Sequence, residues 1–559
     1  MSKLPIWTPL ASLFLALAWL LPNASPPWPS FHKDAWCAVV LCLLANVLLF
    51  KRHQSTVLRF SVNPVSAVLV VLAVMPFVQL DIGLVHFSGH AAIGFAYFYA
   101  AAITCVIGQA WEQSFPGRPG DFLFLALLLA AFGTSGLMLA QWLNLNVNDV
   151  WVNTLNQGAR PYGNLVQPNN AATLLLLGMV SIFWFAILGR VSKKICFVGL
   201  AYLLFHVVLT GSRSGYLSFL LVVLMGLWIG WRRNELRPWR GVFLLLLTSF
   251  PLMVFLVTRD WWGDGAFSQQ PFERNLTSVR ILLYRAYFDA ALASPWLGYG
   301  FEQGALTQLA SARLGHQLPG LFIWAHNAFL DLATWFGLPV TLLAISAAVI
   351  CATALLRAPF SSRRSIYFSG VCVIFVHGMV ELPLAYAYFL LPFSLMLGAM
   401  LAGLKIRSLP FPRIGIVASL AGLSVLLALI ISDYLQIESA FYTWRFKQAN
   451  IGQNHPMDVP NTLVLNQSEA LLTGLRSTPA SITDKSLLDF EQATLLAPSA
   501  AAMQQLAQLQ LRRGDVAGAQ RTADMARILT RGEERKGLAA RWRYLGTQEP
   551  IFLLVEWRE

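Results

Sequence analysis

Long apolar runs recur along most of this chain of 559 residues, and they restrict the folds that it can adopt. A run of about 20 apolar residues can cross a lipid bilayer as a helix, because its backbone hydrogen bonds are then all made inside the segment. Charged residues make up only 12% of the chain, roughly half of their share in soluble proteins. The sequence therefore predicts an all-α polytopic membrane protein with about 11–13 transmembrane helices. The expected spans are 8–22, 36–50, 64–79, 92–110, 121–142, 170–188, 195–210, 215–230, 241–257, 332–356, 365–381, 384–403 and 414–431.

The positive charge of the chain follows these runs and predicts their orientation. Residues 1–431 hold 26 Lys and Arg against 13 Asp and Glu, whereas residues 432–559 hold 14 of each. Of the 26 basic residues, 18 fall in the N-terminus and alternate loops, and eight fall in the opposite loops. Cytoplasmic loops are enriched in Lys and Arg, so we place the basic side in the cytoplasm. The excess charge suggests contacts with anionic membrane lipid, and not with nucleic acid.

The chain divides into a transmembrane domain, residues 1–431, and a polar C-terminal domain, residues 432–559. An odd number of spans puts the C-terminal domain on the non-cytoplasmic side, together with a large loop at 258–331. The stretch "ATLLAPSAAAMQQLAQLQLRRGDVAGAQRTADMARIL" repeats apolar residues at helical spacing around Gly514-Asp515, which resembles a tetratricopeptide helical hairpin. This domain either binds a partner or is a helical cap without an activity of its own.

Three polar stretches on the outer side carry amides and arginines. "QGARPYGNLVQPNNAAT" places Gln167 and Asn169 before an apolar run, where an ordinary loop with a helix cap is the structural alternative. "LTGSRSGYLSFL" puts Arg213 between two runs with almost no loop. "RNLTSVRILLYRAYF" carries Arg280 and Arg285 among aromatic and aliphatic residues, which predicts a helix at the membrane surface with its arginines near lipid headgroups. Arginine suits bidentate contacts with phosphate.

Two further stretches carry ionisable side chains on the same side. "WAHNAFLDLATWFGLP" places His326 and Asn327 where the large loop meets the next apolar run, and a helix cap is again the structural alternative. "HGMVELPLAYAYFLLPF" puts Glu381 and Tyr386 around a short outer turn, for which a pinned helix end is the alternative. Histidine changes its charge near neutral pH and so suits a general base.

We expect neither a metal nor another cofactor. His86 and His90 lie four residues apart, but their motif holds no carboxylate or thiol. "WWGDG" at 261–265 only faintly resembles the acidic signature of N-glycan oligosaccharyltransferases, and there is no DxD pair. The six cysteines lie in or beside apolar runs and form no CxxC motif, so we expect no zinc site and no disulfide framework.

In this order, the stretches resemble a known family. A GN-x-x-QPN loop, a short Ser-Arg loop, a large loop with R-x-x-x-x-R and P-x-LG-x-G, and a final HN-x-x-L before FG-x-P are typical of the O-antigen ligase and polymerase superfamily. "RPYGNLVQPNNAAT" and "HGMVELPLAYAYFLLPF" more particularly resemble the bacterial protein O-oligosaccharyltransferases. The resemblance covers nearly the whole chain. Those enzymes often carry "QPNH" where this chain has Asn170, which leaves the role of that side chain open.

The resemblance implies transfer of an oligosaccharide en bloc from undecaprenyl diphosphate to Ser or Thr of an exported acceptor protein such as a pilin. It implies a multi-pass protein of the bacterial inner membrane whose active site and C-terminal domain face the periplasm. His326 would be the base that activates the hydroxyl, and direct displacement would invert the anomeric centre. Arg213, Arg280 and Arg285 would hold the leaving diphosphate without a metal. Substrate-binding positions would be Gln167, Asn169, Asn327, Glu381 and Tyr386.

Two alternatives to this function stay open. An O-antigen ligase or polymerase would use the same chemistry on lipid A core or on a growing glycan. The polar C-terminal domain and the 377–393 motif favour a protein acceptor instead. A flippase or other transporter of lipid-linked glycan would need cationic residues inside a transmembrane cavity. Here the apolar runs are mostly free of charge, and the candidate residues gather at one face.

Overall fold

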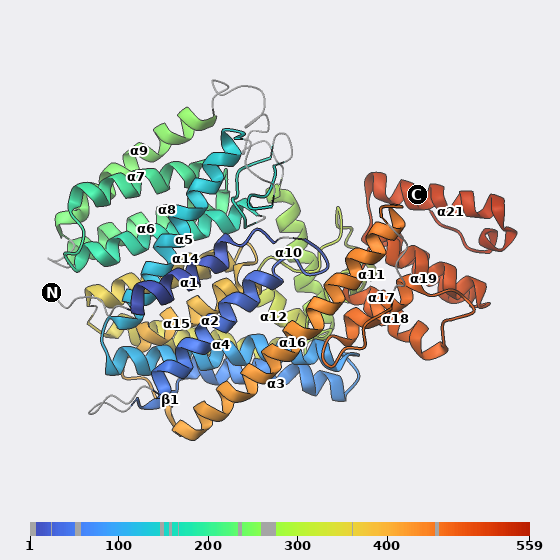
Figure 1. Cartoon of the computed structure of the whole chain (residues 1–559), viewed down its shortest axis with the longest axis horizontal. Coiled ribbons are helices and arrows are strands. Elements are labelled where there is room, and N and C mark those ends of the chain that lie inside the picture. Colours follow the sequence, from blue (N-terminus) through green and yellow to red (C-terminus); the bar gives the residue numbers. More distant parts are fainter. Residues whose placement is uncertain are drawn as a thin grey trace. The chain divides into compact units, whose positions relative to one another are not determined.

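The computed structural model describes residues 7–23, 25–50, 58–145, 150–155, 159–165, 167–232, 237–258, 276–359, 361–452 and 458–558. Residues 259–275 of the large loop, with the "WWGDG" stretch, lie outside the described residues. The described chain is helical almost throughout (Figure 1). It divides into two compact units, which are built from non-consecutive segments. Unit 1 is Met1–Val70, Phe98–Asn275 and Ser346–Leu427, and unit 2 is Val71–Tyr97, Leu276–Ile345 and Ala428–Glu559.

Each expected span falls on a helix. These helices are α1 (Trp7–Leu20), α2 (Phe31–Phe50), α3 (Pro64–Asp81), α4 (Ser88–Ser114), α5 (Arg118–Trp142), α6 (Pro168–Ile187), α7 (Lys193–Leu209), α8 (Arg213–Arg232), α9 (Arg240–Thr258), α13 (Leu338–Arg357), α14 (Ser362–Gly378), α15 (Ala387–Leu401) and α16 (Arg413–Gln448). Nine helices of the described chain are long and apolar enough to cross a membrane, and α1 and α15 are shorter apolar helices. This confirms the expected fold class, an all-α polytopic membrane protein.

Close helix packing in unit 1 places α6 at its centre. Of the apolar window of α6, 94% is buried inside the protein. A side chain at Gly178 would put its Cβ 2.4 Å from the Cβ of Ala131 on α5, so the two helices approach as closely as they do only because residue 178 is glycine. Small residues of this kind hold transmembrane helices together by van der Waals contact. The start of α6, which carries the predicted amides, is therefore firmly positioned.

Two of the expected spans differ most from the structure, because one is divided and the other continues well beyond its expected end. The span at 332–356 is divided at Gly337, which ends α12 (Ala328–Phe336) with a φ of +84°. Glycine tolerates this left-handed conformation, and Pro339 then fits the first turn of α13. The span at 414–431 continues as α16 to Gln448, because no glycine or proline interrupts the polar residues that follow. The expected domain boundary at residue 431 thus falls inside a helix, and that division stays a prediction.

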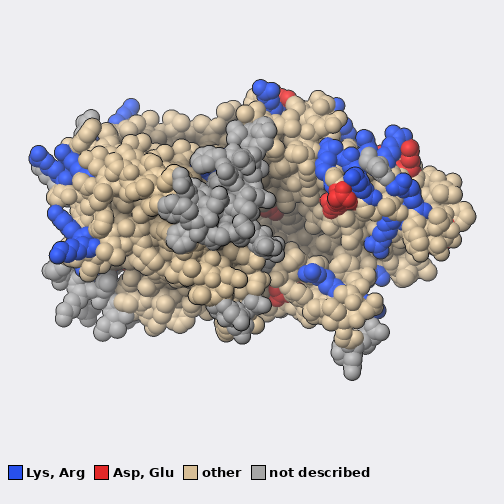
Figure 2. All heavy atoms as spheres, turned by 90° about the horizontal axis from the view of Figure 1, so that it is seen from above, with Lys and Arg blue, Asp and Glu red and all other residues tan. Residues whose placement is uncertain are grey.

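A small sheet was not expected from the sequence. β1 (Phe60–Val62) and β2 (Leu409–Phe411) pair antiparallel, with Phe60 opposite Phe411. They join the loops that follow α2 and α15, both on the predicted cytoplasmic side. Figure 2 shows blue Lys and Arg side chains at one end of unit 1 beside a broad tan surface. Short 3-10 turns are η1 (Arg237–Trp239), η3 (Pro383–Ala385) and η4 (Pro550–Leu554).

Unit 2 contains the helices of the large loop and of the C-terminal domain. These are α10 (Leu276–Ala293), α11 (Gly304–Arg313), α12, α17 (Asn466–Arg476), α18 (Asp484–Leu496), α19 (Ala500–Arg512), α20 (Val516–Leu529) and α21 (Gly532–Gln548). The hairpin expected around Gly514-Asp515 joins α19 to α20, with Gly514 at φ +85°. The Asp515 side chain begins α20 by accepting the Gly518 N–H at 2.7 Å.

The large loop supplies part of the core of the C-terminal domain. Ala305 of α11 is fully buried in a cluster with Ala507 of α19 and Ala523 of α20. The turn between α3 and α4 adds a contact, since His86 lies 2.7 Å from the carboxylate of Asp489. A single tetratricopeptide-like hairpin does not bury enough apolar surface by itself. Here the hairpins α17–α18 and α19–α20 stack on each other and on α11 of the large loop.

Candidate active site

Two motifs far apart in the sequence meet at the start of α6 in unit 1. Asn169 donates an N–H to Oε1 of Glu381 at 2.8 Å, and Gln167 donates to Oε2 at 3.4 Å. The Glu381 side chain is buried. The structure thus brings three of the predicted site residues into one amide–carboxylate cluster. Gln167 itself precedes Pro168 as the N-cap, so α6 begins without a side-chain cap from either asparagine.

Asn170, whose role the sequence left open, directly follows Asn169 of this cluster in α6. Its side chain is buried and lies near the hydroxyls of Tyr386 and Tyr388. The rings of the two tyrosines stack with their centroids 5.2 Å apart. Tyr386, a predicted substrate-binding residue, is therefore packed against Tyr388 near the start of α6.

Sequence reasoning missed Asp34, which lies at the start of α2. Its buried carboxylate accepts the backbone N–H of Tyr388 at 3.3 Å, in the first turn of α15. A carboxylate stabilises the positive end of a helix there. The signal was present, because "HKD" opens an apolar run with two charges.

Arg213 is the first residue of α8 in unit 1, and its side chain is half-buried. The preceding loop is short and well held. Arg160 donates to the backbone oxygen of Gly211 at 2.8 Å, and the Ser212 hydroxyl accepts the Gly215 N–H at 3.0 Å. The role of Arg213 in binding the leaving diphosphate stays a prediction.

Arg280 and Arg285 lie on α10 of unit 2, as the motif predicted for a surface helix. The exposed face of α10 carries Ile281, Phe288 and Leu292, each about half exposed, with the exposed Arg285 among them. An apolar stripe with arginine in its middle is the pattern of a helix that lies in the interface of a membrane. Arg280 is half-buried.

His326 lies in the tight turn just before α12. Its φ is +56°, a left-handed conformation that is uncommon for a residue with a side chain. The Tyr284 hydroxyl of α10 donates to its backbone oxygen at 3.3 Å. The cap of α12 is not His326 but Asn327, whose Oδ1 accepts the N–H groups of Phe329 and Leu330 at 3.1 Å each. The helix cap, which was the structural alternative for His326 and Asn327, is thus made by Asn327. The role of Asn327 in substrate binding stays a prediction.

Asp331 is a second residue that sequence reasoning missed. It lies one turn into α12, its side chain is only 3% exposed, and its Oδ1 accepts the Ala325 N–H at 2.6 Å. The carboxylate thus reaches back across the turn and ties down the residue before His326. Burial raises the pKa of Asp331 to about 7, opposed by the Ala325 N–H and by the nearby His326. An acid five residues after the histidine of an HN motif was the available signal.

We expect Asn327→Ala to destabilise α12 by about 1 kcal/mol, because two N–H groups at its start lose their acceptor. Asn327→Asp should retain the cap, since a carboxylate accepts the same bonds. Thermal unfolding of the purified variants in detergent measures both. An alanine variant as stable as the wild type would contradict the capping role.

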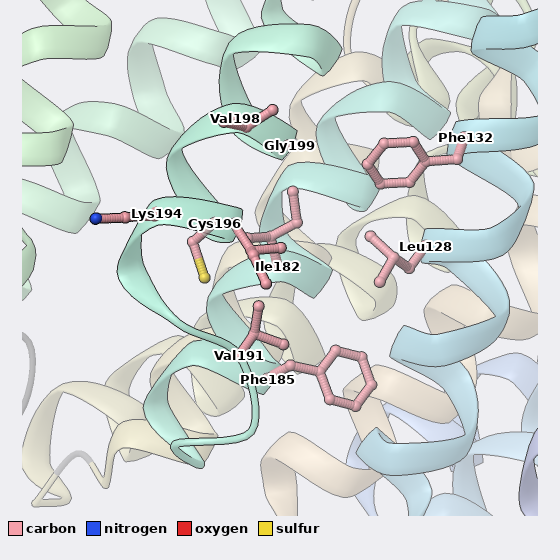
Figure 3. A pocket seen from close by; sticks show the side chains of 10 residues that line it. Leu128, Phe132, Ile182, Phe185, Val191, Lys194, Cys196, Val198 and Gly199 are labelled. Atoms are coloured by element: carbon pink, nitrogen blue, oxygen red, sulfur yellow. The ribbon is translucent and has the colours of Figure 1, made fainter.

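An apolar groove of about 460 Å³ opens between α5, α6 and α7, away from these residues (Figure 3). Leu128, Phe132, Ile182 and Phe185 line it, and Lys194 lies at one side with its ammonium group pointing away. None of the described lining residues is a predicted site residue. The groove suits a hydrocarbon chain and offers nothing that could act on a sugar.

Comparison with known proteins connects these residues to an enzyme family. Residues 198–345 match the O-antigen ligase family, and residues 367–544 match the C-terminal part of the virulence factor membrane-bound polymerase family. The chain is 27% identical over 497 residues to the general O-oligosaccharyltransferase of Acinetobacter baylyi, which covers 86% of this chain and 84% of that protein. It is 25% identical over 395 residues to the ComP-specific O-oligosaccharyltransferase of the same organism, or 69% of either chain.

The chain is similar along most of its length to bacterial O-oligosaccharyltransferases, and its ligase match agrees with the O-antigen ligase superfamily. It is therefore a glycosyltransferase. The ligase match of this transferase contains Arg213, the helix α10 and His326, and the polymerase match contains Glu381 and Tyr386. Gln167 and Asn169 lie outside both matched segments.

Proposed function

We propose that this transferase moves a preassembled oligosaccharide en bloc from undecaprenyl diphosphate to a Ser or Thr hydroxyl of an exported protein such as a pilin. The reaction would take place at the periplasmic face of the bacterial inner membrane. Relatives named as O-oligosaccharyltransferases that align along most of the chain support the reaction class. The alternation of basic loops supports the orientation.

The proposed step is a direct displacement at the anomeric carbon of the sugar. The acceptor oxygen forms a bond to C1 while the bond from C1 to the phosphate oxygen breaks. His326 takes the hydroxyl proton, and undecaprenyl diphosphate leaves with the electron pair. Attack opposite the leaving group inverts the anomeric centre. A positioned base is required because a hydroxyl is a weak nucleophile at neutral pH.

The geometry of His326 is the observation that carries the assignment of the base. Its backbone is held by Tyr284 at its oxygen, by Asp331 through Ala325, and by the capped helix that follows. Uncommon backbone conformations persist where the surroundings determine them, and they cluster at active sites. A turn held in this way presents the half-buried imidazole in one position.

The leaving diphosphate needs fixed positive charge, because negative charge grows on it as the bond breaks. Arg280 and Arg285 on α10 are proposed for this role, together with Arg213 at the start of α8. The exposed apolar stripe of α10 supports it, since a helix embedded in the membrane interface brings its arginines to the depth of a lipid-borne phosphate. Guanidinium groups bind two phosphate oxygens at once.

The cluster of Gln167, Asn169 and Glu381 is proposed to bind the glycan, with Tyr386 beside it. Amides and carboxylates exchange hydrogen bonds with sugar hydroxyls, and aromatic rings pack against sugar faces. The supporting observation is that the buried Glu381 carboxylate accepts hydrogen bonds from the side-chain amides of Gln167 and Asn169. Asn327 is proposed as a further substrate-binding residue, as the sequence predicted.

The test is mass spectrometry of exported proteins from cells that make one defined undecaprenyl-linked glycan, with and without the transferase. We expect the intact glycan on Ser or Thr only when the transferase is present and His326 is intact. Unmodified proteins, with the glycan found on lipid A core or lengthened on its carrier, would contradict a protein acceptor. That result would assign ligase or polymerase activity, after which the matched families are named.

A further inference from the structure

The C-terminal domain is neutral as a whole, but its charges are segregated. Residues 516–548, which form α20 and α21, hold seven Lys and Arg against three Asp and Glu. Figure 2 shows blue side chains gathered over the part of the molecule that Figure 1 labels α19 and α21, with few red ones among them. The basic residues are Arg521, Arg527, Arg531, Arg535, Lys536, Arg541 and Arg543.

Three of these residues, Arg527, Arg531 and Arg535, surround the turn between α20 and α21, and we call them the turn arginines. Arg535 covers the end of α20 by donating to the backbone oxygens of Arg527 at 2.7 Å and of Thr530 at 3.0 Å. Burial lowers the pKa of Arg535, and the positive charges of the other two turn arginines lower it further. These like charges therefore repel one another.

The turn arginines differ from their neighbours in their ion pairs. Lys536 pairs with Glu533, Arg512 with Glu549, and Arg513 with Asp484. Among the described residues, no carboxylate forms an ion pair with any of the turn arginines. Their backbone contacts use only some of the five N–H donors of each guanidinium. An anionic partner would use the remaining donors and remove the repulsion.

The turn arginines adjoin the loop that carries the proposed base. Arg531 donates its Nε–H to the backbone oxygen of Leu318 at 2.8 Å. Leu318 is buried in a small core with Ala325, which directly precedes His326, and with Leu283 of α10. All of these residues belong to unit 2. A ligand bound at the turn arginines is thus close to the segment where an acceptor hydroxyl must arrive.

The chemistry of this surface differs from that of a lipid-facing helix. The helix α10 exposes Ile281, Phe288 and Leu292, as contact with a bilayer requires. Between Arg521 and Arg543, by contrast, the described chain exposes no large apolar side chain. Charge without an apolar face favours a water-soluble, anionic partner over a membrane.

We infer that the turn arginines form a docking surface for an acidic segment of the acceptor protein, which places a nearby Ser or Thr at His326. This inference rests on the proposed function, in which a protein is the acceptor. Carboxylates of such a segment would pair with guanidinium groups that the fold already holds in place. The C-terminal domain would then select acceptors, and not merely cap the large loop.

Peptide binding to the full-length protein in phosphatidylcholine nanodiscs tests this surface. Two fluorescein-labelled peptides of equal length are compared by anisotropy, one alternating Ser with Asp and the other alternating Ser with Asn. We expect the acidic peptide to bind about tenfold more tightly, as a few exposed ion pairs allow. Added salt should abolish the difference.

Variants locate the binding on the protein. Changing the three turn arginines to Gln should remove the preference for the acidic peptide. Because Arg531 and Arg535 also hold backbone oxygens, the single variant Arg527→Glu, at an exposed side chain, provides a second test that spares the fold. The matched control is Arg521→Gln with Arg541→Gln, which removes two exposed arginines from the same helices away from the turn.

Three outcomes of the binding experiment would overturn the inference. These are equal binding of both peptides, equal loss in the control variant, and loss of binding when phosphatidylglycerol is added to the nanodiscs, which would assign the arginines to lipid. The function is judged separately by glycan transfer. Acidic-peptide binding through the turn arginines without transfer to any protein would contradict the proposed function alone. Transfer with equal KM for acidic and neutral acceptors would contradict the docking surface alone.

Discussion

His326→Ala is expected to lower glycan transfer by about 10²–10⁴-fold while leaving the protein folded. The side chain is half-buried in a surface turn, and alanine removes the base without disturbing the cap that Asn327 makes. The measurement is transfer of a defined undecaprenyl-linked glycan to an acceptor protein by purified enzyme. The rate constant of glycan transfer at saturating donor, compared between the variant and the wild type, measures the effect of losing the base.

The control for this variant is another histidine of the same loop. His316 lies 2.7 Å from the carboxylate of Asp289 and has no proposed role in the chemistry. His316→Ala should therefore retain transfer. Full activity of His326→Ala would refute the assignment of the base, and equal losses in both variants would show that the loop is merely sensitive to substitution.

Asp331→Ala is expected to have the second-largest effect, through the position of His326. Alanine leaves the buried Ala325 N–H without its acceptor, which costs about 1–3 kcal/mol. Release of this residue loosens the turn, and a displacement of about 1 Å at a reacting group can lower the rate by about 10²-fold. Asp331→Asn keeps an oxygen acceptor of the same shape, so it should restore most of the rate.

The pH dependence of stability gives a second measure of Asp331. Burial raises its pKa to about 7 in the folded protein, against an ordinary value of 3.8. The folded state therefore holds the proton more tightly, and this contribution to stability is complete below the ordinary pKa and is lost as the pH rises to about 7. Thermal unfolding of the wild type should show this loss, with His326 and Glu302 as the neighbouring charges.

Asp331→Asn should abolish this part of the pH dependence, because the amide does not titrate. Asp289→Asn, at a partly exposed carboxylate, serves as the matched control and should keep the dependence of the wild type. A wild type and an Asp331→Asn variant with the same pH profile would contradict the raised pKa. Loss of transfer in Asp331→Asn as large as in Asp331→Ala would contradict the positioning role.

The ends of the predicted elements show where local sequence was sufficient. Gly514-Asp515 was correctly predicted as the turn of a helical hairpin, since a left-handed glycine and a capping aspartate act within a few residues. Gly337 was an equally local signal for the end of a helix inside the expected span 332–356. It lies within a continuous apolar run, which favoured one uninterrupted helix. The helix α16 continues past the predicted domain boundary at residue 431, because no glycine or proline interrupts it there.

For the candidate site, the sequence likewise predicted some features and not others. The motifs identified Glu381, Asn169 and His326 as residues of interest, but not their contacts. Glu381 and Asn169 are 212 residues apart, and only the packing of α14 against α6 brings them to a hydrogen bond of 2.8 Å. Whether His326 or Asn327 caps α12 depended on a backbone angle that neither residue type dictates.

The sequence by itself determined the class of fold, because a bilayer leaves an apolar run no stable form except a helix with internal hydrogen bonds. It also indicated the resemblance to the O-oligosaccharyltransferases, through short motifs in a fixed order. The tertiary structure alone decided which polar groups are buried and what they contact. Asp331 is an acid inside an apolar stretch in the sequence, and it became a buried tether of the His326 turn only through folding. Burial and pairing of this kind arise from contacts between elements, which hydrophobic periodicity and helix signals do not encode.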